Sequence, residues 1–334
     1  MAVRQYLSPQ LRLVGIFELK FKLINKTGFL IRSLKAREVM GAADVEPVSI
    51  YKQYYYKDCK NYKDCQIKVP YIPGSSLKGR ARSLLELALG LSLSTTDGKI
   101  YYHMRVGEGN KIIHDDPYCP VDNVFGSMSV QPMYYQPSEE GENPYTWLVE
   151  KCWAPTRAIF RDMYPSEDYI SDLCREKGGC GNITFEDFLE EKSENRIDRV
   201  TSAADPRTIL RVKPDVEFEG SISFLVFDLD VCRRRECDEH SKLKDLIKDY
   251  PARFYLQSLV EALMLVEETY IGGSGSRGYG SIKFKDIELY FHNLAMNEPA
   301  PSKIDTFDEL TKLRDFIGRI EVFDAIKRSI CGAT

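Results

Sequence analysis

The sequence predicts an α+β fold with a ferredoxin-like core and protruding insertions. Apolar and polar residues alternate over 13–24, 218–230 and 281–291, which is typical of half-buried strands. Apolar residues recur at helical spacing over 76–90 and 251–268. The resulting order is strand, helix, strand, helix, strand, with long stretches between the elements. It lacks the short repeated strand–helix units of a doubly wound sheet, which favours the α+β class.

The first strand and the first helix are the clearest of these elements. In the strand, Phe17 and Leu19 share one face, while Glu18 lies on the other. The helix follows a Pro-Gly pair, and Ser75 or Ser76 can cap its first amides. Apolar side chains then repeat at helical spacing as far as a glycine that can end the helix.

The composition is that of a folded protein. With 43% hydrophobic and 29% charged residues, the 334-residue chain can bury a core of one or two domains. No apolar stretch approaches the about 18 residues of a membrane span, and residues 1–10 lack the features of a secretory signal. We therefore expect a cytoplasmic protein without a membrane partner. Because the formal net charge is -4, any nucleic-acid site must be a local basic stripe on an acidic body.

A basic cluster lies at the start of the predicted helix, in the phrase PGSSLKGRAR. It contains Ser75, Ser76, Lys78, Arg80 and Arg82. Aligned N–H groups and the helix dipole make such a helix start a good phosphate site. An ordinary capped helix with solvated basic side chains is an equally good interpretation of this segment taken alone.

A second candidate for anion binding is the glycine-rich phrase GGSGSRGYG, residues 272–280. Gly273, Ser274 and Ser276 would let backbone amides approach an anion, and Arg277 can reach a phosphate. The phrase lacks the G-x-x-x-x-G-K-[ST] pattern of nucleotide hydrolases, and it precedes a strand. On the pattern alone, a glycine-rich connection is the simpler interpretation.

The third segment, NRIDRVTSAADPRTILRVK at 195–213, is basic and contains an Asp-Pro turn signal. Arg196, Arg199 and Arg207 belong to it, together with Thr201. A basic hairpin that projects from the body is suited to contact nucleic acid. A solvated hairpin without a partner is the alternative.

These phrases occur together in the order and wording of a known family. IPGSSLKGRARSLLE, NRIDRVTSAADPR and IGGSGSRGYGSIKF, with FGSM at 125–128 and AIFRDMYP at 158–165, resemble the repeat-associated mysterious protein (RAMP) superfamily. The similarity is greatest to the repeated backbone subunit of type III CRISPR RNA-guided effector complexes, of the III-A/III-D kind. It extends from about Leu13 to Tyr290.

The resemblance implies an RNA-recognition-type core that carries a thumb hairpin and a lid. On this basis one RAMP domain would span 1–305, with the thumb at about 194–214, and 306–334 would form a C-terminal helical tail. Four stretches that do not match the family are expected to be insertions, at about 50–68, 92–118, 129–154 and 166–192.

The resemblance also implies RNA partners and a larger assembly. The chain would bind a CRISPR guide RNA and complementary target RNA, beside other effector subunits and further copies or paralogues of itself. The guide would lie against Ser75, Ser76, Lys78, Arg80, Arg82, Gly273, Ser274, Ser276 and Arg277, and the thumb would present Arg196, Arg199, Thr201 and Arg207 to target RNA. Because guide pairing would read the sequence, the protein would recognise backbone and shape.

By the same resemblance, Asp44 in the phrase GAAD is the expected catalytic residue of an endoribonuclease. A splayed target nucleotide can align its 2′-OH with the scissile phosphate, and Asp44 would bind a divalent ion or accept the hydroxyl proton. Because an unperturbed carboxylate is a weak base at neutral pH, Mg²⁺ is the expected cofactor. The expected products carry a 2′,3′-cyclic phosphate and a 5′-OH.

Two other functions remain open. The chain has T-G-F-L-I-R-S where the family often has T-G-L-H-I-G-G, and an inactive guide-binding scaffold is the first alternative. The second is a guide-processing ribonuclease from a related branch, which usually relies on a histidine general base. Only His103, His114, His240 and His292 are available, and none lies in a phrase typical of that activity.

The nine cysteines are compatible with a structural zinc ion, a disulfide or free thiols. Some relatives have a Cys/His cluster around a C-P-x-C-x-x-F-G phrase. This chain has C-P-V-D-N-V-F-G, with Asp122 in place of the second cysteine. His114, Cys119, Cys174 and Cys180 are the candidate zinc ligands.

Overall fold

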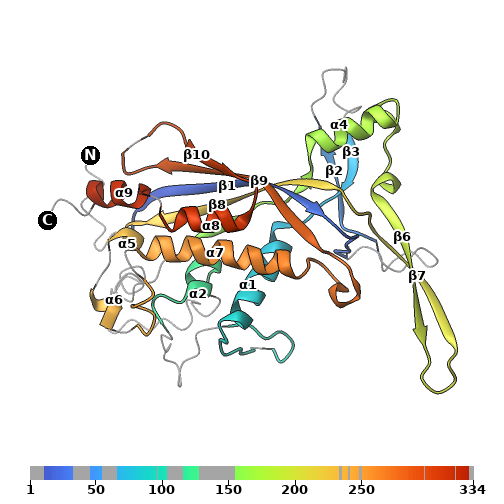
Figure 1. The fold of residues 1–334 in the computed structure, drawn as a ribbon, viewed down its shortest axis with the longest axis horizontal. Coiled ribbons are helices and arrows are strands. Elements are labelled where there is room, and N and C mark those ends of the chain that lie inside the picture. The colour runs from blue at the N-terminus through green and yellow to red at the C-terminus, as the bar shows by residue number, and fades with distance from the viewer. Residues whose placement is uncertain are drawn as a thin grey trace, which may run out of the picture.

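The computed structural model describes most of the chain. The described residues are 11–32, 46–54, 66–95, 97–103, 116–127, 155–232, 235–239, 241–247, 250–296, 298–319 and 321–330. Among them, no helix is both long enough and apolar enough to span a membrane. The fold belongs to the mixed α+β class, with helices against one face of a large sheet and a hairpin that projects from the body (Figure 1).

The large sheet has six strands, and each pair of neighbours is antiparallel. Its order is β10-β9-β1-β8-β4, and β5 also pairs with β8. The strands are β1 (Leu13–Asn25), β4 (Ala158–Phe160), β5 (Tyr164–Pro165), β8 (Glu217–Phe227), β9 (Ile282–Asn293) and β10 (Ser302–Phe307). Residues of β1 alternate between buried and partly exposed positions, so one face of the sheet packs on the core and the other carries polar side chains.

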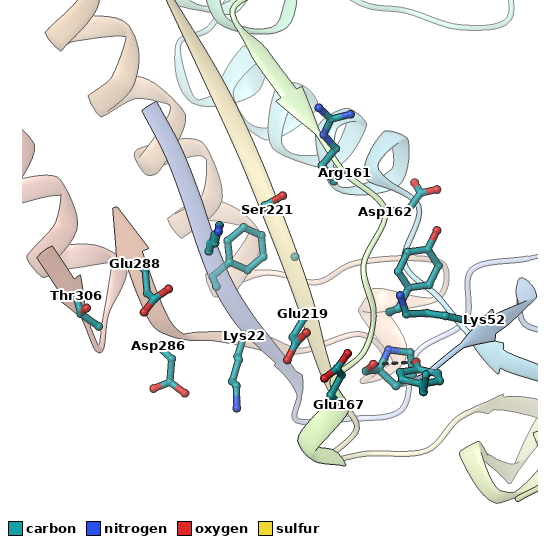
Figure 2. Close-up of a pocket in the computed structure, with 16 residues that line it drawn as sticks. Lys22, Lys52, Arg161, Asp162, Glu167, Glu219, Ser221, Asp286, Glu288 and Thr306 are labelled. Carbon is teal, nitrogen blue, oxygen red and sulfur yellow. Dashed lines mark hydrogen bonds between the residues drawn. The ribbon is translucent and has the colours of Figure 1, made fainter. Parts of the chain in front are cut away.

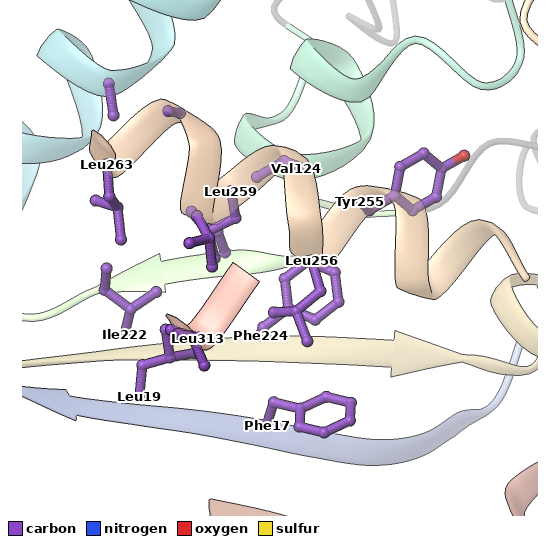
Figure 3. Close-up of a cluster of buried hydrophobic side chains, with 14 of the residues drawn as sticks. Phe17, Leu19, Val124, Ile222, Phe224, Tyr255, Leu256, Leu259, Leu263 and Leu313 are labelled. Atoms are coloured by element: carbon purple, nitrogen blue, oxygen red, sulfur yellow. The ribbon is translucent and has the colours of Figure 1, made fainter. Parts of the chain in front are cut away.

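Helices cover the core face of the sheet. They are α1 (Gly74–Ala88), α2 (Pro120–Phe125), α7 (Pro251–Glu268) and α8 (Leu310–Ile317). Phe17 and Leu19 of β1 and Phe224 of β8 face Leu256 and Leu259 of α7 (Figure 3), and none of these side chains is exposed. Burial of each such side chain stabilises the fold by about 1.5–3 kcal/mol. This packing fixes α7 against the sheet, and α1 lies beside α7.

The C-terminal segment belongs to the same core. β10 pairs with β9, and α8 and α9 (Val322–Ile330) follow it. Leu313, Ile317, Phe323 and Ile326 are fully buried. The described residues of the expected C-terminal helical tail at 306–334 therefore form helices whose apolar faces pack on this core.

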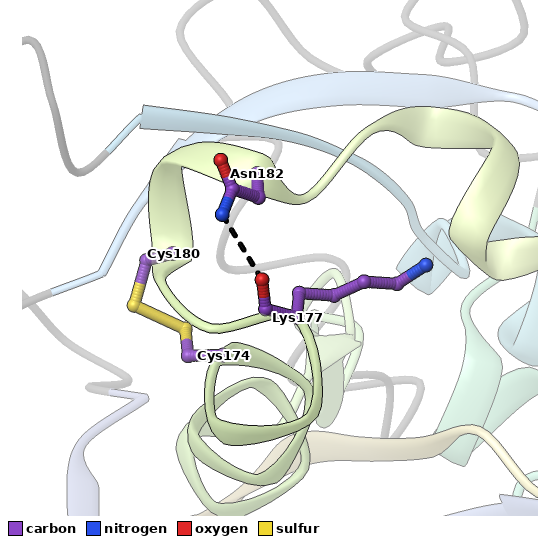
Figure 4. Close-up of a disulfide and its surroundings, with 4 residues drawn as sticks. All are labelled: Cys174, Lys177, Cys180 and Asn182. Atoms are coloured by element: carbon purple, nitrogen blue, oxygen red, sulfur yellow. Dashed lines mark hydrogen bonds between the residues drawn. A yellow bond between two sulfur atoms is a disulfide. The ribbon is translucent and has the colours of Figure 1, made fainter.

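A small lobe lies over the other face of the sheet, at one end (Figure 1). It combines β2 (Ser49–Gln53), β3 (Gln66–Pro70), α4 (Glu167–Glu176), and the short helices η5 (Cys180–Asn182) and η6 (Phe185–Phe188). Ile170 and Phe188 belong to a buried cluster that is separate from the main core. A disulfide between Cys174 and Cys180 joins α4 to η5 (Figure 4). The lobe is therefore a cross-linked unit with a core of its own.

The projecting hairpin follows this lobe directly. It consists of β6 (Leu189–Ile197) and β7 (Ala204–Val212). Asp198 closes its turn, because the carboxylate accepts hydrogen bonds from the N–H groups of Val200 and Thr201 at 3.0 and 2.7 Å. The remaining described helices are the short α5 (Asp228–Val231), α6 (Arg235–Glu239) and η7 (Gly275–Arg277).

Candidate nucleic-acid interface

The start of α1 contacts the glycine loop, which we define as residues 270–280. The Nε–H of Arg80 donates to the carbonyl of Tyr270 at 3.1 Å, and the guanidinium lies 4.0 Å from the centre of the Tyr270 ring. The hydrogen bond and the cation–π contact together hold the planar guanidinium in place. Two of the three segments singled out in the sequence therefore meet.

Glycine is required in this loop where the backbone approaches other segments. Gly272 has a φ of +77°, and a Cβ atom there would lie 2.7 Å from the carbonyl oxygen of Leu30. Gly280 has a φ of +74°, and its Cβ atom would lie 2.0 Å from the carbonyl oxygen of Ile271. The N–H of Gly273 also donates to Leu30 O at 2.9 Å. The glycine loop is therefore folded tightly against the segment that follows β1.

The outer edge of the glycine loop carries the predicted anion-binding side chains. Ser274 has a φ of 61°, a left-handed conformation that costs a non-glycine residue on the order of 1 kcal/mol. Ser276 and Arg277, in η7, are exposed. A strained serine at the start of this turn thus holds a hydroxyl and a guanidinium toward solvent.

The base of the hairpin contacts the same segment after β1. Phe29 and Val212 exchange two backbone hydrogen bonds, at 3.2 and 2.9 Å. A Cβ atom on Gly28 would lie 2.4 Å from Nε of Arg211 on β7. The third segment singled out in the sequence therefore lies beside the glycine loop, and residues 28–30 contact both of them.

Glu194 of β6 binds the glycine loop to the hairpin. Its carboxylate accepts hydrogen bonds from the hydroxyl of Tyr279 at 2.8 Å, from Arg207 at 2.9 Å and from Arg277 at 3.4 Å. The Tyr279 hydroxyl and then Arg207 hold the pKa of Glu194 below its usual value. Burial and the bond to Glu194 raise the pKa of Tyr279 to about 12.

The ring of Tyr279 also receives two cations. Lys192 Nζ lies 4.2 Å and Arg211 Cζ 4.5 Å from its centre. Because this ring is almost fully buried, both cations lie over an apolar surface that water does not reach. Tyr279 and Glu194 therefore form one junction between the glycine loop and the hairpin base.

The first amide of α1 is not capped by a serine. The helix begins at Gly74, so Ser75 and Ser76 lie inside its first turn, and the N–H of Gly74 donates to the carboxylate of Asp162 at 2.8 Å. The expected serine cap is therefore wrong, because a carboxylate from the β4–β5 connection reaches the helix start. Ser75 remains exposed and Ser76 partly exposed.

Lys78 is a half-buried cation in α1. Burial, and then the charge of Arg82, lower the pKa of its ammonium group. Among the described residues, no carboxylate forms an ion pair with Lys78. A nearby phosphate would stabilise the charged form of Lys78, because its negative charge would offset both the cost of burying the ammonium and the repulsion from Arg82.

Arg82 has a structural role. It forms an ion pair with Glu86 at 2.7 Å and donates to the carbonyl oxygens of Gly126 and His103, each at 2.8 Å. Only 15% of its side chain is exposed. Its guanidinium joins α1 to the segments at 103 and 126, and a contact between Arg82 and RNA stays a prediction.

The hairpin residues named from the sequence differ in their surroundings. Arg196 forms an ion pair with Asp205 across the strands at 2.7 Å, whereas Arg199 is exposed at the turn. Thr201 also donates its hydroxyl to Asp198 at 2.9 Å and so stabilises the turn. The tip from 196 to 205 thus carries Arg196 and Arg199 beside Asp198 and Asp205, so its formal charges balance.

Two apolar residues at this tip were not singled out in the sequence. Ile197 is 65% exposed and Val200 is 92% exposed. Exposed apolar side chains on a projecting hairpin are a surface that a partner can cover. The sequence did contain a sign of this surface, because both apolar residues lie among the polar residues of the turn.

Asp44 lies outside the described residues, but the chain on both sides of it is described. Arg32 and Pro47 form an antiparallel bridge, and the N–H of Val48 donates to the carbonyl of Ile31 at 2.8 Å. This stem continues the segment that contacts the glycine loop through Leu30. Arg32 and Pro47, the described residues on either side of the segment that carries Asp44, therefore belong to a stem that directly follows the contact between Leu30 and the glycine loop.

The four predicted zinc ligands do not form one site. Cys174 and Cys180 are joined in a disulfide, so neither offers a thiolate, and His114 lies outside the described residues. The predicted set is corrected for this reason. Cys119 is instead a buried free cysteine.

A different group of metal-ligating residues surrounds Cys119. His103, Cys119 and Asp122 are buried, and their ligand atoms all lie within 4.8 Å of one another. Hydrogen bonding to Asp122 first, and then to Cys119, raises the pKa of His103 to about 10 against the opposing effect of burial. The donor types, which are one imidazole, one thiol and one carboxylate, suit zinc. His103 was missed because it lies far from the C-P-V-D phrase in the sequence.

A pocket of about 620 Å³ lies on the sheet face away from the helices (Figure 2). Cations such as Lys22, Lys52 and Arg161 line it, but so do the carboxylates of Glu167 and Glu219. Burial, and then the charge of Glu167, raise the pKa of Glu219. Because both charge signs line this pocket, we do not assign it to a polyanion.

Comparison with known proteins places the chain among RNA-processing relatives. The RAMP superfamily model matches residues 66–283. The CRISPR system Cms endoribonuclease Csm3 of Methanocaldococcus jannaschii is 31% identical over 260 residues, which cover 75% of this chain and 77% of that protein. The protein of the same name from Methanothermobacter thermautotrophicus is 30% identical over 227 residues, covering 68% and 72%.

Among solved structures, the Methanopyrus kandleri Csm3 crystal structure is 18% identical, with a TM-score of 0.48 over 92% of this chain and 99% of that one. The family match covers more than half of the chain and includes the start of α1, the hairpin and the glycine loop. The chain belongs to the RAMP superfamily.

Proposed function

We propose that this chain is a backbone subunit of a type III CRISPR effector complex that binds guide RNA and cleaves complementary target RNA. One observation carries the proposal: α1, the glycine loop and the hairpin base meet beside the stem of the segment that holds Asp44. The relatives named endoribonuclease support the activity. Other effector subunits and further copies of the chain would complete the complex.

The guide backbone would lie over the start of α1 and the edge of the glycine loop. Lys78, Arg80 and Arg277 supply positive charge there, and Ser75 and Ser276 supply exposed hydroxyls. Contacts of this kind bind phosphates without reading bases. Gly273, Ser274 and Ser76 would shape the same surface, whereas Arg82 would support α1 from within.

The hairpin would act as the thumb that separates guide from target at regular intervals. Val200 and Ile197 are exposed apolar side chains at its tip, and such side chains can wedge between bases. Arg196, Arg199 and Arg207, with Thr201, would contact the target backbone around this wedge. The splayed nucleotide would then leave A-form geometry.

Asp44 would act at the splayed nucleotide. Consecutive Cα atoms are about 3.8 Å apart, so three peptide links keep the Cα atom of Asp44 within about 11 Å of that of Pro47. The 2′-oxygen would attack the adjacent phosphorus and lose its proton, while the P–O5′ bond breaks and O5′ gains a proton. The products would carry a 2′,3′-cyclic phosphate and a 5′-OH.

A divalent ion fits the carboxylates in this segment. Asp44 and Glu46 offer oxygen ligands of the type that Mg²⁺ prefers, and the ion would stabilise the charge that develops on the phosphate. Lys78 and Arg277 would orient the strand by holding its phosphates. Asp44 itself would position or deprotonate the attacking hydroxyl.

The sheet would be a ferredoxin-like, RNA-recognition-type core. The order β9-β1-β8-β4, the antiparallel pairings, and α1 and α7 as the two connecting helices support this assignment. On this basis residues 1–305 would form the RAMP domain, with the thumb at about 194–214. The small lobe corresponds to two of the proposed insertions, near 50–68 and 166–192.

The test is cleavage of labelled complementary RNA by assembled complexes with Asp44→Asn in the presence of Mg²⁺. Binding should persist while cleavage is lost, and Glu46→Gln should lose part of the activity, because Glu46 would be a second oxygen ligand of the ion. If the wild type cleaves the RNA and Asp44→Asn cleaves it equally well, Asp44 is not the catalytic residue. A wild-type complex that binds target without cutting it would favour the inactive scaffold.

A guide-processing ribonuclease is less well supported. His103 is only 1% exposed, and His292 Nε2 is 2.8 Å from the backbone oxygen of Glu298. Neither described histidine is therefore placed as a solvent-accessible general base. Cleavage of precursor repeat RNA by the purified chain alone would reverse this order of preference.

A further inference from the structure

We propose that Glu194 is an internal competitor for RNA, whose carboxylate binds Arg277 until an RNA phosphate takes that arginine. The Arg277 Nη1 atom lies 3.4 Å from Oε2 of Glu194. The inference rests on the proposed function, because that function supplies the phosphate as the second partner of Arg277. It adds a residue that lowers RNA affinity to those that raise it.

Glu194 is held in place without Arg277. The Tyr279 hydroxyl donates to Oε1 at 2.8 Å, and Arg207 donates to Oε2 at 2.9 Å. Only 13% of the Glu194 side chain is exposed. Since two shorter bonds satisfy the carboxylate, the departure of Arg277 would leave no buried charge unpaired.

Arg277 is placed to change partners. Its side chain is 56% exposed, and its bond to Glu194 is the longest of the three that the carboxylate receives. Among the described residues, Glu194 is the one carboxylate recorded as its partner. A rotation of the side chain alone would carry the guanidinium from Glu194 to a strand on the glycine loop.

The backbone of the loop would remain attached to the hairpin during this exchange. Lys192 Nζ donates to the carbonyl of Arg277 at 3.0 Å, and the same ammonium lies over the ring of Tyr279. Neither contact involves the Arg277 guanidinium. The exchange is therefore confined to one side chain, and its effect on affinity is separable from folding.

The segment before α8 supplies a control of the same charge. Asp308 pairs with Lys312 at 2.7 Å, both side chains are largely exposed, and neither belongs to the interface described above. Asp308→Asn removes one negative charge, as Glu194→Gln does. Glu194→Gln retains an oxygen that accepts from Tyr279.

The experiment measures the affinity of the full chain for a labelled single-stranded RNA at several salt concentrations. Glu194→Gln should bind about two- to fivefold more tightly, the range expected for release of a partly exposed ion pair. Its affinity should also fall more steeply with salt, because Arg277 then contacts a phosphate fully. Asp308→Asn should remain close to the wild type.

The double variant gives the decisive comparison. In an Arg277→Ala background, Glu194→Gln should no longer tighten binding, because no arginine is left to release. An equal gain in Glu194→Gln and Asp308→Asn, or a gain that persists without Arg277, overturns the proposal. If Glu194→Gln does not fold, Glu194→Asp is the second variant. It keeps the negative charge, but its shorter side chain moves the carboxylate away from Arg277. Tighter binding by that variant supports the proposal, and unchanged binding overturns it.

Failure of the proposed function gives a different result. A wild-type chain that binds no RNA, alone or in its complex, contradicts both ideas. A wild-type chain that binds RNA and is weakened by Arg277→Ala, but unaffected by Glu194→Gln, contradicts the competitor alone.

Discussion

The carboxylate of Asp162 accepts a hydrogen bond from the N–H of Gly74 at 2.8 Å, so a side chain of the β4–β5 connection caps the first amide of α1. Asp162→Ala should lower the free energy of unfolding by about 0.5–2 kcal/mol, because it removes both a cap and a charge at the positive end of the helix. Ser75→Ala, at the exposed serine in the same turn, should cost less. Urea unfolding compares the two, and a larger effect from Ser75→Ala would contradict this assignment of the cap.

Lys78 should strengthen RNA binding but lower the stability of the protein without RNA. The lowered pKa of Lys78 means that the folded state disfavours its charged ammonium form. This cost to the free energy of unfolding is fully present below the folded pKa, and it disappears as the pH rises from there toward 10.5, the pKa of the unfolded state. Lys78→Met should therefore maintain or raise the melting temperature at pH 7, weaken RNA binding and flatten its salt dependence.

Lys312→Met is a matched control for that prediction. Lys312 is exposed on α8 and paired with Asp308, so its removal should leave RNA affinity close to the wild type. Thermal melting and RNA titration of both variants provide the comparison. Equal loss of affinity in the two variants would show that total charge, and not the position of Lys78, governs binding.

Two glycines should respond oppositely to alanine. Gly280→Ala places a Cβ atom 2.0 Å from a backbone oxygen at a φ of +74°, so it should destabilise the fold by about 2 kcal/mol or more and weaken RNA binding. A Cβ atom on Gly79, inside α1, would have open space for 4 Å around it, and alanine there should stabilise the helix by about 0.5–1 kcal/mol. Chemical denaturation tests both, and a tolerated Gly280→Ala would contradict the tight loop.

The cluster of His103, Cys119 and Asp122 should bind zinc. Addition of Zn²⁺ to the metal-free chain should raise its melting temperature, because three buried ligands gain a cation. Cys119→Ser should greatly reduce this shift, whereas the disulfide-bonded Cys174 and Cys180 should not contribute. Metal content and melting curves measure the effect, and equal zinc binding by Cys119→Ser would exclude the site.

The mixed fold class was accessible from the sequence because local patterns determine it. Alternation marks the region of β1, and helical spacing marks α1 and α7, since each buries one face. The packing of the C-terminal helices was not accessible from the sequence, because an amphipathic helix has the same pattern whether it caps a core or forms a tail. Only the burial of residues such as Leu313 distinguishes the two.

The contacts within the interface depend on residues far apart in the sequence. Asp162 lies 88 residues from Gly74, and Glu194 lies 85 residues from Tyr279, so no local pattern indicates either pair. Arg82 looked like a surface cation because its i,i+4 spacing from Lys78 was visible and its backbone partners were not. The sequence therefore indicated which segments carry the chemistry, while the fold determined which side chains remain available.

The central claim is that an RNA strand lies across the glycine loop beside α1. Its most direct test is a photo-crosslinking residue at exposed Ser276, compared with one at exposed Thr311 on α8, each in the full chain with bound RNA. The account predicts efficient crosslinking from position 276 and little from position 311. Crosslinking that is equal at both positions, or stronger from position 311, would contradict it.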